Sequence, residues 1–498
     1  MDGVIVTGSV DIRHVWSALG GDPALVSAVS QVVRPGVLDA RLPVRDLARA
    51  CVGACALAAA ELAARRAGRA EVPGVRVDDG AVAAAFTSER HLRVDGREPV
   101  AFAPLSRLWR TADGWVRTHA NYPHHRQRLL AALGAPGDVD ALEAMLAGRS
   151  ATEVEESVYA AGGLAVALRT PEQWAASAQA AAVARRPLVE RGRLDASPAR
   201  VFTSPAPRSA GPPGLLVPPL LPAAGLRVLD LTRVLAGPVA TRTLALLGAD
   251  VLRVDPPGMP ELTDQHADTG FGKRSATLDL TRHQEEFEEL LRTADVVVTG
   301  YRPGALDRFG LSPEALAARR PGLVVARLSA WGEYGPWAGR RGFDSLVQVA
   351  TGIAVIEGAA GRPGALPAQA LDHGTGYLLA AGVLRALTEQ SYEGGGRFVR
   401  VTLARTAAWL TGGLRPADGD GTGGPDDADG HGDAGGARKA GGTGVGPAAY
   451  PGPDPWLAER DSGLGRLRYA LPPVSFRGGP TDWARPPGPW GADTARWT

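Results

Sequence analysis

Short runs of apolar, β-branched residues alternate with helical patterns from residue 226 onward, and this alternation limits the fold more than any other feature of the chain. Each run has the length of a single strand: LRVLDL (226–231), DVLRV (250–254), DVVVT (295–299) and LVVARL (323–328). Amphipathic helical patterns lie between them at AGPVATRTLALLG (236–248) and HQEEFEELLRTA (283–294). Parallel strands are joined by crossovers of this kind, so the pattern predicts an α/β fold with a parallel sheet and helices on its faces.

Composition divides the rest of the 498 residues, a length that predicts two or three domains. Residues 1–197 are Ala-rich and helical in pattern, apart from a short strand-like insert. Eight prolines within 198–222 exclude a helix interior or a central strand, so we expect a linker over 198–224. The 14 glycines and six aspartates of 412–446 cannot build a core, which predicts a disordered loop over 412–455. Residues 456–498 again have strand-like patterns.

One internal repeat links the two ends of the chain. Residues 42–66 align without gaps on 366–390 at an offset of 324, and the register continues where 74–86 fall on 398–410. Chance matches between Ala-rich segments are one explanation, and a degenerate duplication is the other. The copies differ chemically, because Asp372 stands where the first copy has Ala48. Only the second copy therefore offers a carboxylate at that point.

Charge, cysteine content and the absence of common motifs exclude several classes of protein. The net charge of +1 gives no electrostatic reason to expect nucleic acid or an anionic membrane as a partner. Cys51 and Cys55, the two cysteines, are spaced as one buried helix face, and we see no metal-ligand cluster. The N-terminus lacks the pattern of a signal peptide and no apolar run reaches the length of a membrane span, so we expect a cytoplasmic protein. Neither G-x-G-x-x-G nor a Walker A loop follows the first strand.

Four runs after residue 224 carry a resemblance: LRVLDLTRVLAGPVATRTLALLGADVLRVDPPG, GKRSATLDL, ADVVVTGYRPGALDRFGL and WGEYGPWAGRRGFDSLVQVATG. They resemble successive landmarks of the family III CoA-transferases, a group that also contains formyl-CoA transferase, the carnitine CoA-transferases and the α-methylacyl-CoA racemases. LDHGTGYLLAAGVLRAL falls where that family has the helix bearing its catalytic aspartate. The resemblance implies a Rossmann-like parallel sheet with flanking helices plus a smaller α+β domain.

The same resemblance assigns roles to the segments. Residues 225–411 become the CoA-binding, Rossmann-like catalytic domain, and 1–197 a degenerate half-repeat containing a small-domain-like segment at 98–190. Residues 456–498 become a second small-domain-like segment. Because a small-domain-like piece comes first, the order departs from that of the family. The chain resembles a fused, partly trimmed duplication, and we expect a homodimer, as in the family.

The resemblance also implies a mechanism and a site. Asp372 matches the family's nucleophile, which moves CoA from an acyl-CoA to a carboxylic acid acceptor through an aspartyl intermediate. A position just before a helix would keep this carboxylate ionised, although the same position suits a simple N-cap. Gly374 and Gly376 are candidate oxyanion donors. The residues expected to bind CoA are Val234, Leu235, Ala236, Leu278, Thr281, Gly300, Tyr301, Ala305, Arg308 and Arg341.

Several departures from the family leave alternatives open. Leu235 replaces a glutamine of formyl-CoA transferase and Pro256 a basic residue of some members, which argues against an oxalate-type substrate. The racemases carry a catalytic histidine in a G-H-D triplet, whereas this chain has Phe343 there, so a racemase would need His373 as a substitute. A catalytically inactive CoA-binding homologue is the third possibility.

Overall fold

A seven-stranded sheet forms the centre of the molecule, and six of its strands are parallel. Its order is β11-β10-β9-β12-β13-β14-β8, in which only β8 runs antiparallel to its neighbour. The strands are β8 (Glu190–Arg193), β9 (Arg227–Leu231), β10 (Asp250–Asp255), β11 (Arg274–Thr277), β12 (Val296–Thr299), β13 (Val324–Ser329) and β14 (Arg397–Thr402). The order of the parallel strands reverses direction between β9 and β12, as in Rossmann sheets. The predicted α/β fold is confirmed.

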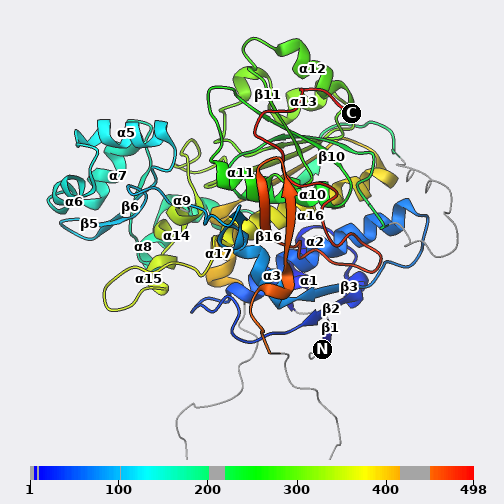
Figure 1. Cartoon of the computed structure of the whole chain (residues 1–498), viewed down its shortest axis with the longest axis horizontal. Coiled ribbons are helices and arrows are strands. Elements are labelled where there is room, and N and C mark those ends of the chain that lie inside the picture. The colour runs from blue at the N-terminus through cyan, green and yellow to red at the C-terminus, as the bar shows by residue number, and fades with distance from the viewer. Residues whose placement is uncertain (1–4, 8–9, 101, 201–218, 415–448) are drawn as a thin grey trace, which may run out of the picture.

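The structure is a computed structural model that describes residues 5–7, 10–100, 102–200, 219–414 and 449–498 (Figure 1). Most of the predicted linker at 198–224 and of the predicted loop at 412–455 lies outside these residues. The predictions for those two segments therefore stay predictions.

Helices cover both faces of the sheet because its strands are apolar on both sides. Val296 and Val298 of β12 pack with α10 (Ala236–Leu246) and α16 (Ala370–Glu393) on one face. Val297, between them, packs with α12 (Gln284–Thr293) and α13 (Pro313–Arg319) on the other face. Both helices predicted from the sequence, over 236–248 and 283–294, are present.

The described residues among the N-terminal 94 contact the helix that carries Asp372 through their longest helix, α2 (Val44–Arg66). They form β1 (Ile5–Thr7), α1 (Val10–Ala18), η1 (Pro23–Ala28), β2 (Val29–Val32), α2, β3 (Val75–Asp78), α3 (Asp79–Phe86), α4 (Ser88–His91) and β4 (Arg93–Val94). Helix α2 lies along α16 in the middle of the molecule (Figure 1). It is long and apolar enough to cross a membrane, but 94% of that apolar stretch is buried inside the molecule. Cys51 and Cys55 are buried in it, as predicted.

The structure shows the same succession of elements at both ends of the sequence repeat. Helix α2, β3 and α3 correspond, at the offset of 324 residues, to α16, β14 and α17 (Leu403–Gly412). Asp78 and Thr402, which are equivalent, each cap the following helix through a side-chain oxygen. Glu61 and Arg385, also equivalent, form an ion pair between α2 and α16. An origin by duplication stays a prediction, but the two copies pack against each other as partners.

One lobe of the chain has a core of its own, made of residues between 105 and 167. It contains β5 (Leu108–Arg110), β6 (Trp115–Thr118), α5 (Pro123–Leu133), α6 (Val139–Ala147), α7 (Ala151–Ala160) and β7 (Ala165–Ala167), on the left in Figure 1. This lobe falls inside the segment 98–190. Helices α8 (Pro171–Ala175) and α9 (Ala178–Ala184) then lead back to β8 at the edge of the sheet.

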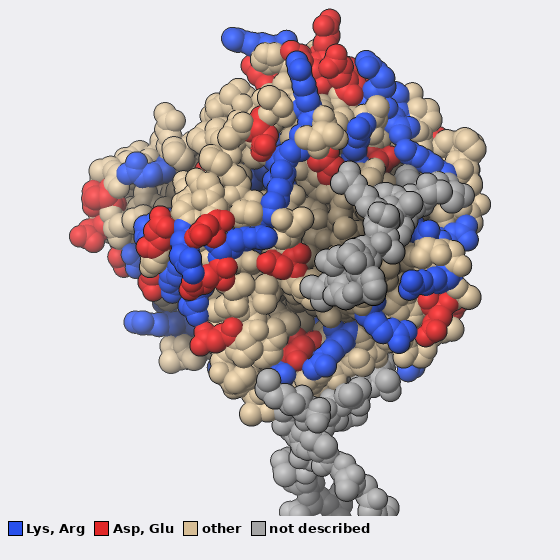
Figure 2. Space-filling view, turned by 45° about the vertical axis from the view of Figure 1, so that its right-hand side comes forward, with Lys and Arg blue, Asp and Glu red and all other residues tan. Residues whose placement is uncertain are grey.

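The C-terminal segment ties both halves together. It follows the short turn η3 (Asp454–Trp456) with β15 (Leu457–Ser462) and β16 (Gly465–Ala470), and β16 pairs with β4 of the N-terminal half. Its last residues lie along β11, where the Ser275 N–H donates to Asp493. Basic and acidic side chains are interspersed on the face shown in Figure 2, in keeping with the near-neutral net charge.

Helices α10 and α16 approach so closely that Gly376 has no room for a side chain. A Cβ atom there would lie 2.5 Å from the Ala236 carbonyl oxygen and 3.0 Å from Val239. We expect Gly376→Ala to destabilise the protein by about 1–3 kcal/mol, because backbone atoms would have to move. Gly114→Ala is the control, since a Cβ at Gly114 would meet nothing within 4 Å. Denaturant unfolding measures both; equal stability of the two variants would contradict the packing argument.

Candidate active site

A large cavity lies at the carboxyl ends of the parallel strands, where open α/β sheets bind ligands, and a small cavity adjoins it. The large cavity has a volume of about 800 Å³, and residues that follow β9, β10, β11, β12 and β13 line it. The small cavity has a volume of about 360 Å³ and shares Val234, Leu235 and Phe343 with the large one. All ten residues expected to bind CoA line the large cavity, and so does Asp372.

The loop between β9 and α10 separates the two cavities. Val234 in this loop has a φ of +71°, a backbone conformation that is strained for a β-branched residue. Its N–H donates to the Glu261 carboxylate at 3.1 Å, which fixes this conformation. Helix α10 begins two residues later, at Ala236, whose N–H therefore lies at the cavity wall. Pro238 has no N–H, and the Val239 N–H donates to the Leu235 carbonyl at 2.8 Å.

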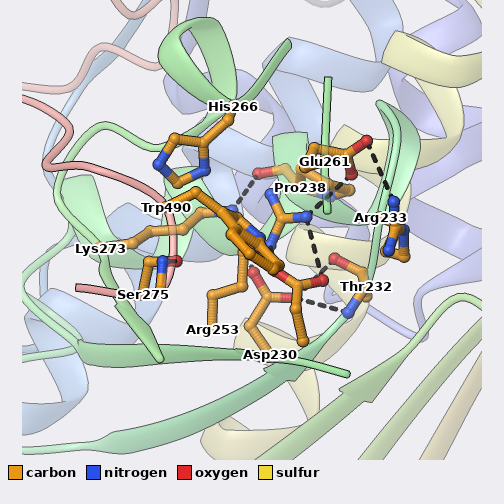
Figure 3. A network of polar contacts seen from close by, with 12 residues as sticks. Asp230, Thr232, Arg233, Pro238, Arg253, Glu261, His266, Lys273, Ser275 and Trp490 are labelled. Carbon is orange, nitrogen blue, oxygen red and sulfur yellow. Dashed lines mark hydrogen bonds and ion pairs between the residues drawn. The ribbon is translucent and has the colours of Figure 1, made fainter. Parts of the chain in front are cut away.

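A buried polar network holds that loop from beneath (Figure 3). Asp230 accepts hydrogen bonds from Thr232 N–H at 3.0 Å and from Lys273 Nζ at 3.0 Å. Lys273 also donates to the Pro238 carbonyl at 3.0 Å, which joins the loop to the start of α10. Burial lowers the pKa of Lys273 to about 8 and the charge of Asp230 opposes that shift. Through these two contacts, Lys273 holds the backbone of the loop in place.

The N-terminal half supplies one wall of the large cavity, which the sequence did not predict. Tyr122, His124, His125 and Arg128, at the start of α5, line it opposite the Rossmann strands. The Tyr122 hydroxyl donates to Glu261, the same carboxylate that holds Val234. The sequence signal was the segment 108–134, which loosely resembles the start of the family's small domain; none of its residues was expected to bind CoA.

Arg128, Arg302 and Arg341 form a basic cluster in the large cavity. Burial lowers the pKa of Arg341, and the charges of Arg302 and Arg128 lower it further. Among the described residues, none of the three forms an ion pair with a carboxylate, although Arg128 donates to the Gly162 carbonyl at 3.2 Å. Such a cluster is suited to an anionic ligand that brings its own negative charge.

Asp372 lies in the first turn of α16 and is 5% exposed. Its N–H donates to Asp344 at 3.0 Å, and the N–H of Leu371 donates to the same oxygen at 2.9 Å. Asp344, the first residue of α14 (Asp344–Ala350), therefore caps the helix that carries Asp372. Burial and the nearby carboxylates of Asp344 and Glu89 raise the pKa of Asp372 well above its usual range. Burial also raises the pKa of Asp344, to about 6.

These contacts correct the expectation that the helix terminus keeps Asp372 ionised. The helix begins at Ala370, before Asp372, and Asp344 already accepts the first N–H groups. What remains is a buried carboxyl among other carboxyls, which favours the protonated form at rest.

Gly374 and Gly376 are not oxyanion donors in this structure. Both lie inside α16, where N–H groups point to carbonyls of the preceding turn, and neither lines the two cavities. A Cβ at Gly374 would lie 2.9 Å from Leu47 of α2, so these glycines allow close helix packing. The N–H group of Ala236, at the start of α10, is better placed to meet a ligand.

His373, the side chain that a racemase would need, is poorly placed for proton transfer, and Phe343 carries no transferable proton. His373 is fully buried, stacks on Phe86 at 5.2 Å, and lines neither cavity. Its Nε2 lies 3.6 Å from Glu89. Phe343 lines both cavities and stacks on His119 at 3.7 Å, and burial lowers the pKa of His119 to about 3.

Comparison with known proteins decides the family. The model of CoA-transferase family III matches residues 27–204 and 223–435, on both sides of the proline-rich segment. This chain belongs to CoA-transferase family III. The sequence resemblance is thereby confirmed, including for the N-terminal half.

Individual relatives match a smaller part of the chain. It is 36% identical over 209 residues to the probable fatty acyl-CoA transferase Rv3272 of Mycobacterium tuberculosis, covering 39% of this chain and 53% of that protein. It is 35% identical over 195 residues to a formyl-CoA:oxalate CoA-transferase of Bradyrhizobium, covering 36% of this chain and 45% of the relative. A crystal structure of Rv3272 matches with 35% identity and a TM-score of 0.37, covering 39% of this chain and 58% of that one. The chain spans about half the length of the curated relatives it matches.

The raised pKa of Asp372 predicts that removing its charge stabilises the protein. In the unfolded chain this carboxyl ionises near pH 3.9, whereas the folded protein holds the proton to a higher pH. Folding stability therefore falls as the pH rises above about 4, by up to about 1.4 kcal/mol per pH unit, until the folded pKa is reached. We expect Asp372→Asn to be more stable than wild type at pH 7, with a gain that vanishes near pH 4.

Thermal unfolding between pH 4 and pH 8 measures this gain. Asp279→Asn is the control, because hydrogen bonds from Thr281 lower the pKa of Asp279 and the sign of the effect is reversed. A gain for Asp372→Asn that does not change with pH would contradict the titration argument.

Proposed function

We propose that this protein transfers CoA from an acyl-CoA to a free carboxylic acid, with Asp372 as the nucleophile. One observation carries the proposal: the matching aspartate lines a large cavity that has a basic cluster and adjoins the small cavity. The large cavity would hold CoA and the small one the acyl group. Membership of CoA-transferase family III supports this assignment.

The proposed reaction starts with the buried carboxylate of Asp372 next to the thioester of a bound acyl-CoA. The ionised Asp372 attacks the thioester carbonyl, the C–S bond breaks, and CoA thiolate leaves behind a mixed anhydride. The thiolate then attacks the aspartyl carbonyl, which releases the first acid and leaves an aspartyl-CoA thioester. The acceptor carboxylate attacks that thioester, and the same two steps in reverse form the new acyl-CoA and restore Asp372.

Several groups of the chain would support these steps. The N–H group of Ala236, at the start of α10, lies at the cavity wall, where it can stabilise the negative charge on a tetrahedral oxygen. Asp344 acts as a positioning residue, since it fixes the first turn of α16. Burial of Asp372 limits water, which would otherwise hydrolyse the anhydride. Asp372 must lose its proton before it can attack, so activity should rise with pH.

A second part of the proposal concerns the phosphates of CoA. Arg128, Arg302 and Arg341 would bind them, with Arg308 at the same cavity, while Leu278 and Thr281 flank the adenine. Arg128 belongs to the N-terminal half, so both halves of one chain would contribute to a single site. The homodimer and the cytoplasmic location expected from the sequence stay predictions; in a homodimer each subunit would carry its own site.

The covalent intermediate is the direct test of the nucleophile. After incubation with an acyl-CoA, we expect the intact mass to rise by the mass of CoA less one water, with the adduct on the peptide containing Asp372. Asp372→Asn should keep its affinity for CoA and lose both the adduct and transfer. Transfer that survives in this variant would overturn the assignment. Deuterium uptake at the α-carbon without transfer would indicate a racemase, and CoA binding without turnover an inactive homologue.

The basic cluster makes a separate prediction for affinity. We expect Arg128→Gln to weaken CoA binding by about tenfold or more, because a charge-assisted hydrogen bond to phosphate is lost. Arg126→Gln is the matched control on the same helix, since Arg126 does not line the cavity. Calorimetric titration with CoA at low and high salt measures both variants. Equal affinities would show that phosphate binds elsewhere.

A further inference from the structure

We propose that Arg117 binds a second carboxylate at the far end of the substrate's acyl group, so that the acid transferred is a dicarboxylic acid. This inference rests on the proposed function, since it takes the small cavity as the place of the acyl group. It concerns a residue to which neither the family resemblance nor the sequence patterns gave a role.

The small cavity lies where the acyl group would have to go. It shares Val234, Leu235 and Phe343 with the large cavity. Its wall also includes Gln369, three residues before Asp372, and Asp344, which accepts a hydrogen bond from the Asp372 N–H. Its volume of about 360 Å³ is room for about a dozen water-sized groups, taking about 30 Å³ for each. An acyl group larger than formyl or oxalyl therefore fits.

Among the described residues, the charged groups on this wall form ion pairs, except for Arg117 and Asp344. Arg93 lies 3.1 Å from Glu98 and Arg90 lies 3.8 Å from Glu89. Two of the remaining acids also pair with arginines: Asp264 with Arg97, and Asp268 with Arg242 at 3.2 Å. Asp344 instead accepts hydrogen bonds from Gln348 and from two backbone N–H groups. Within the part of the chain that the structure describes, Arg117 forms no ion pair.

Arg117 is held so that its guanidinium remains available. It extends from β6, and its guanidinium lies 5.0 Å from the centre of the Phe102 ring, which also lines the cavity. Its Nε is buried, and no hydrogen-bond partner for it occurs among the described residues. Burial lowers the pKa of Arg117 to about 10, and Asp344 partly opposes this shift. A cation kept half-buried without a partner is costly unless a ligand supplies the opposite charge.

The ligand group that best suits Arg117 is a carboxylate. A planar guanidinium stacked on a ring presents its edge, and that edge matches the two oxygens of a carboxylate. A phosphate would bring about two negative charges to a wall where a single cation is unmatched. His119 beside it does not add a charge, because burial and the charge of Arg117 keep its pKa near 3.

Selectivity between matched acceptors tests the inference. Succinate, glutarate and adipate are compared as CoA acceptors with butyrate, valerate and hexanoate, using wild type, Arg117→Gln and Arg117→Lys. We expect wild type to prefer one of the dicarboxylates, and Arg117→Gln to lower kcat/KM for it by about tenfold or more while monocarboxylates are unchanged. Arg117→Lys should restore part of the preference.

Arg110→Gln is the matched control. Arg110 lies on the neighbouring strand β5, also over an aromatic ring, at 5.3 Å from Trp115, but outside both cavities. The Arg110→Gln variant should keep the wild-type preference for the dicarboxylate. A direct readout without CoA is calorimetric binding of the preferred dicarboxylate, which Arg117→Gln should lose.

The outcomes separate this inference from the proposed function. Transfer to both classes of acid without a preference, or a preference unchanged in Arg117→Gln, overturns the role of Arg117 and leaves the transferase intact. Dicarboxylate binding that depends on Arg117 without any transfer supports the site and contradicts the proposed reaction. If wild type neither binds dicarboxylates nor transfers CoA to them, the inference is overturned outright.

Discussion

The contact between α2 and α16 is the constraint on which the rest of the molecule depends. Nine of the 23 residues of helix α2 are alanine and two are cysteine, and these small side chains let α16 lie directly along it. The residue with the strongest demand for this closeness is Gly374, whose missing side chain leaves room for Leu47. The helix that carries Asp372 is thus buried between the two halves of the chain. Neither half could form this environment alone.

Basic and acidic side chains are separated around that helix. The large cavity carries arginines without carboxylate partners, whereas the carboxyl groups of Asp344, Asp372 and Glu89 are gathered near the start of α16. Each group of carboxyls is costly to bury unless hydrogen bonds satisfy it or protons neutralise it. Asp344 accepts hydrogen bonds from three donors. Asp372 instead holds a proton, because its pKa is raised. A buried carboxyl that holds its proton is therefore kept at the expense of stability, as is common at functional sites.

The sequence was informative wherever the determining contacts were local. Strand lengths and apolar spacing predicted the parallel sheet. The ten residues that the family resemblance assigned to CoA all line the large cavity. Prediction failed where distant segments meet. Tyr122, Arg128 and Glu89 reach the cavities from the N-terminal half, and no pattern within that half reveals which strand ends they will face. The start of α16 was misplaced for the same reason, because its cap, Asp344, comes from another helix.

The edge strand β8 has a consequence for how the chain assembles during synthesis. Arg193 of β8 pairs with Arg397 of β14, so β8 leaves the ribosome long before its partner exists. At about 5–20 residues per second, this strand waits roughly 10–40 s with its backbone groups unpaired. An unpaired strand edge is open to pairing with other chains. The N-terminal half therefore completes its edge strand only after β14 has been synthesised. Nascent chains are most exposed to aggregation before that pairing forms.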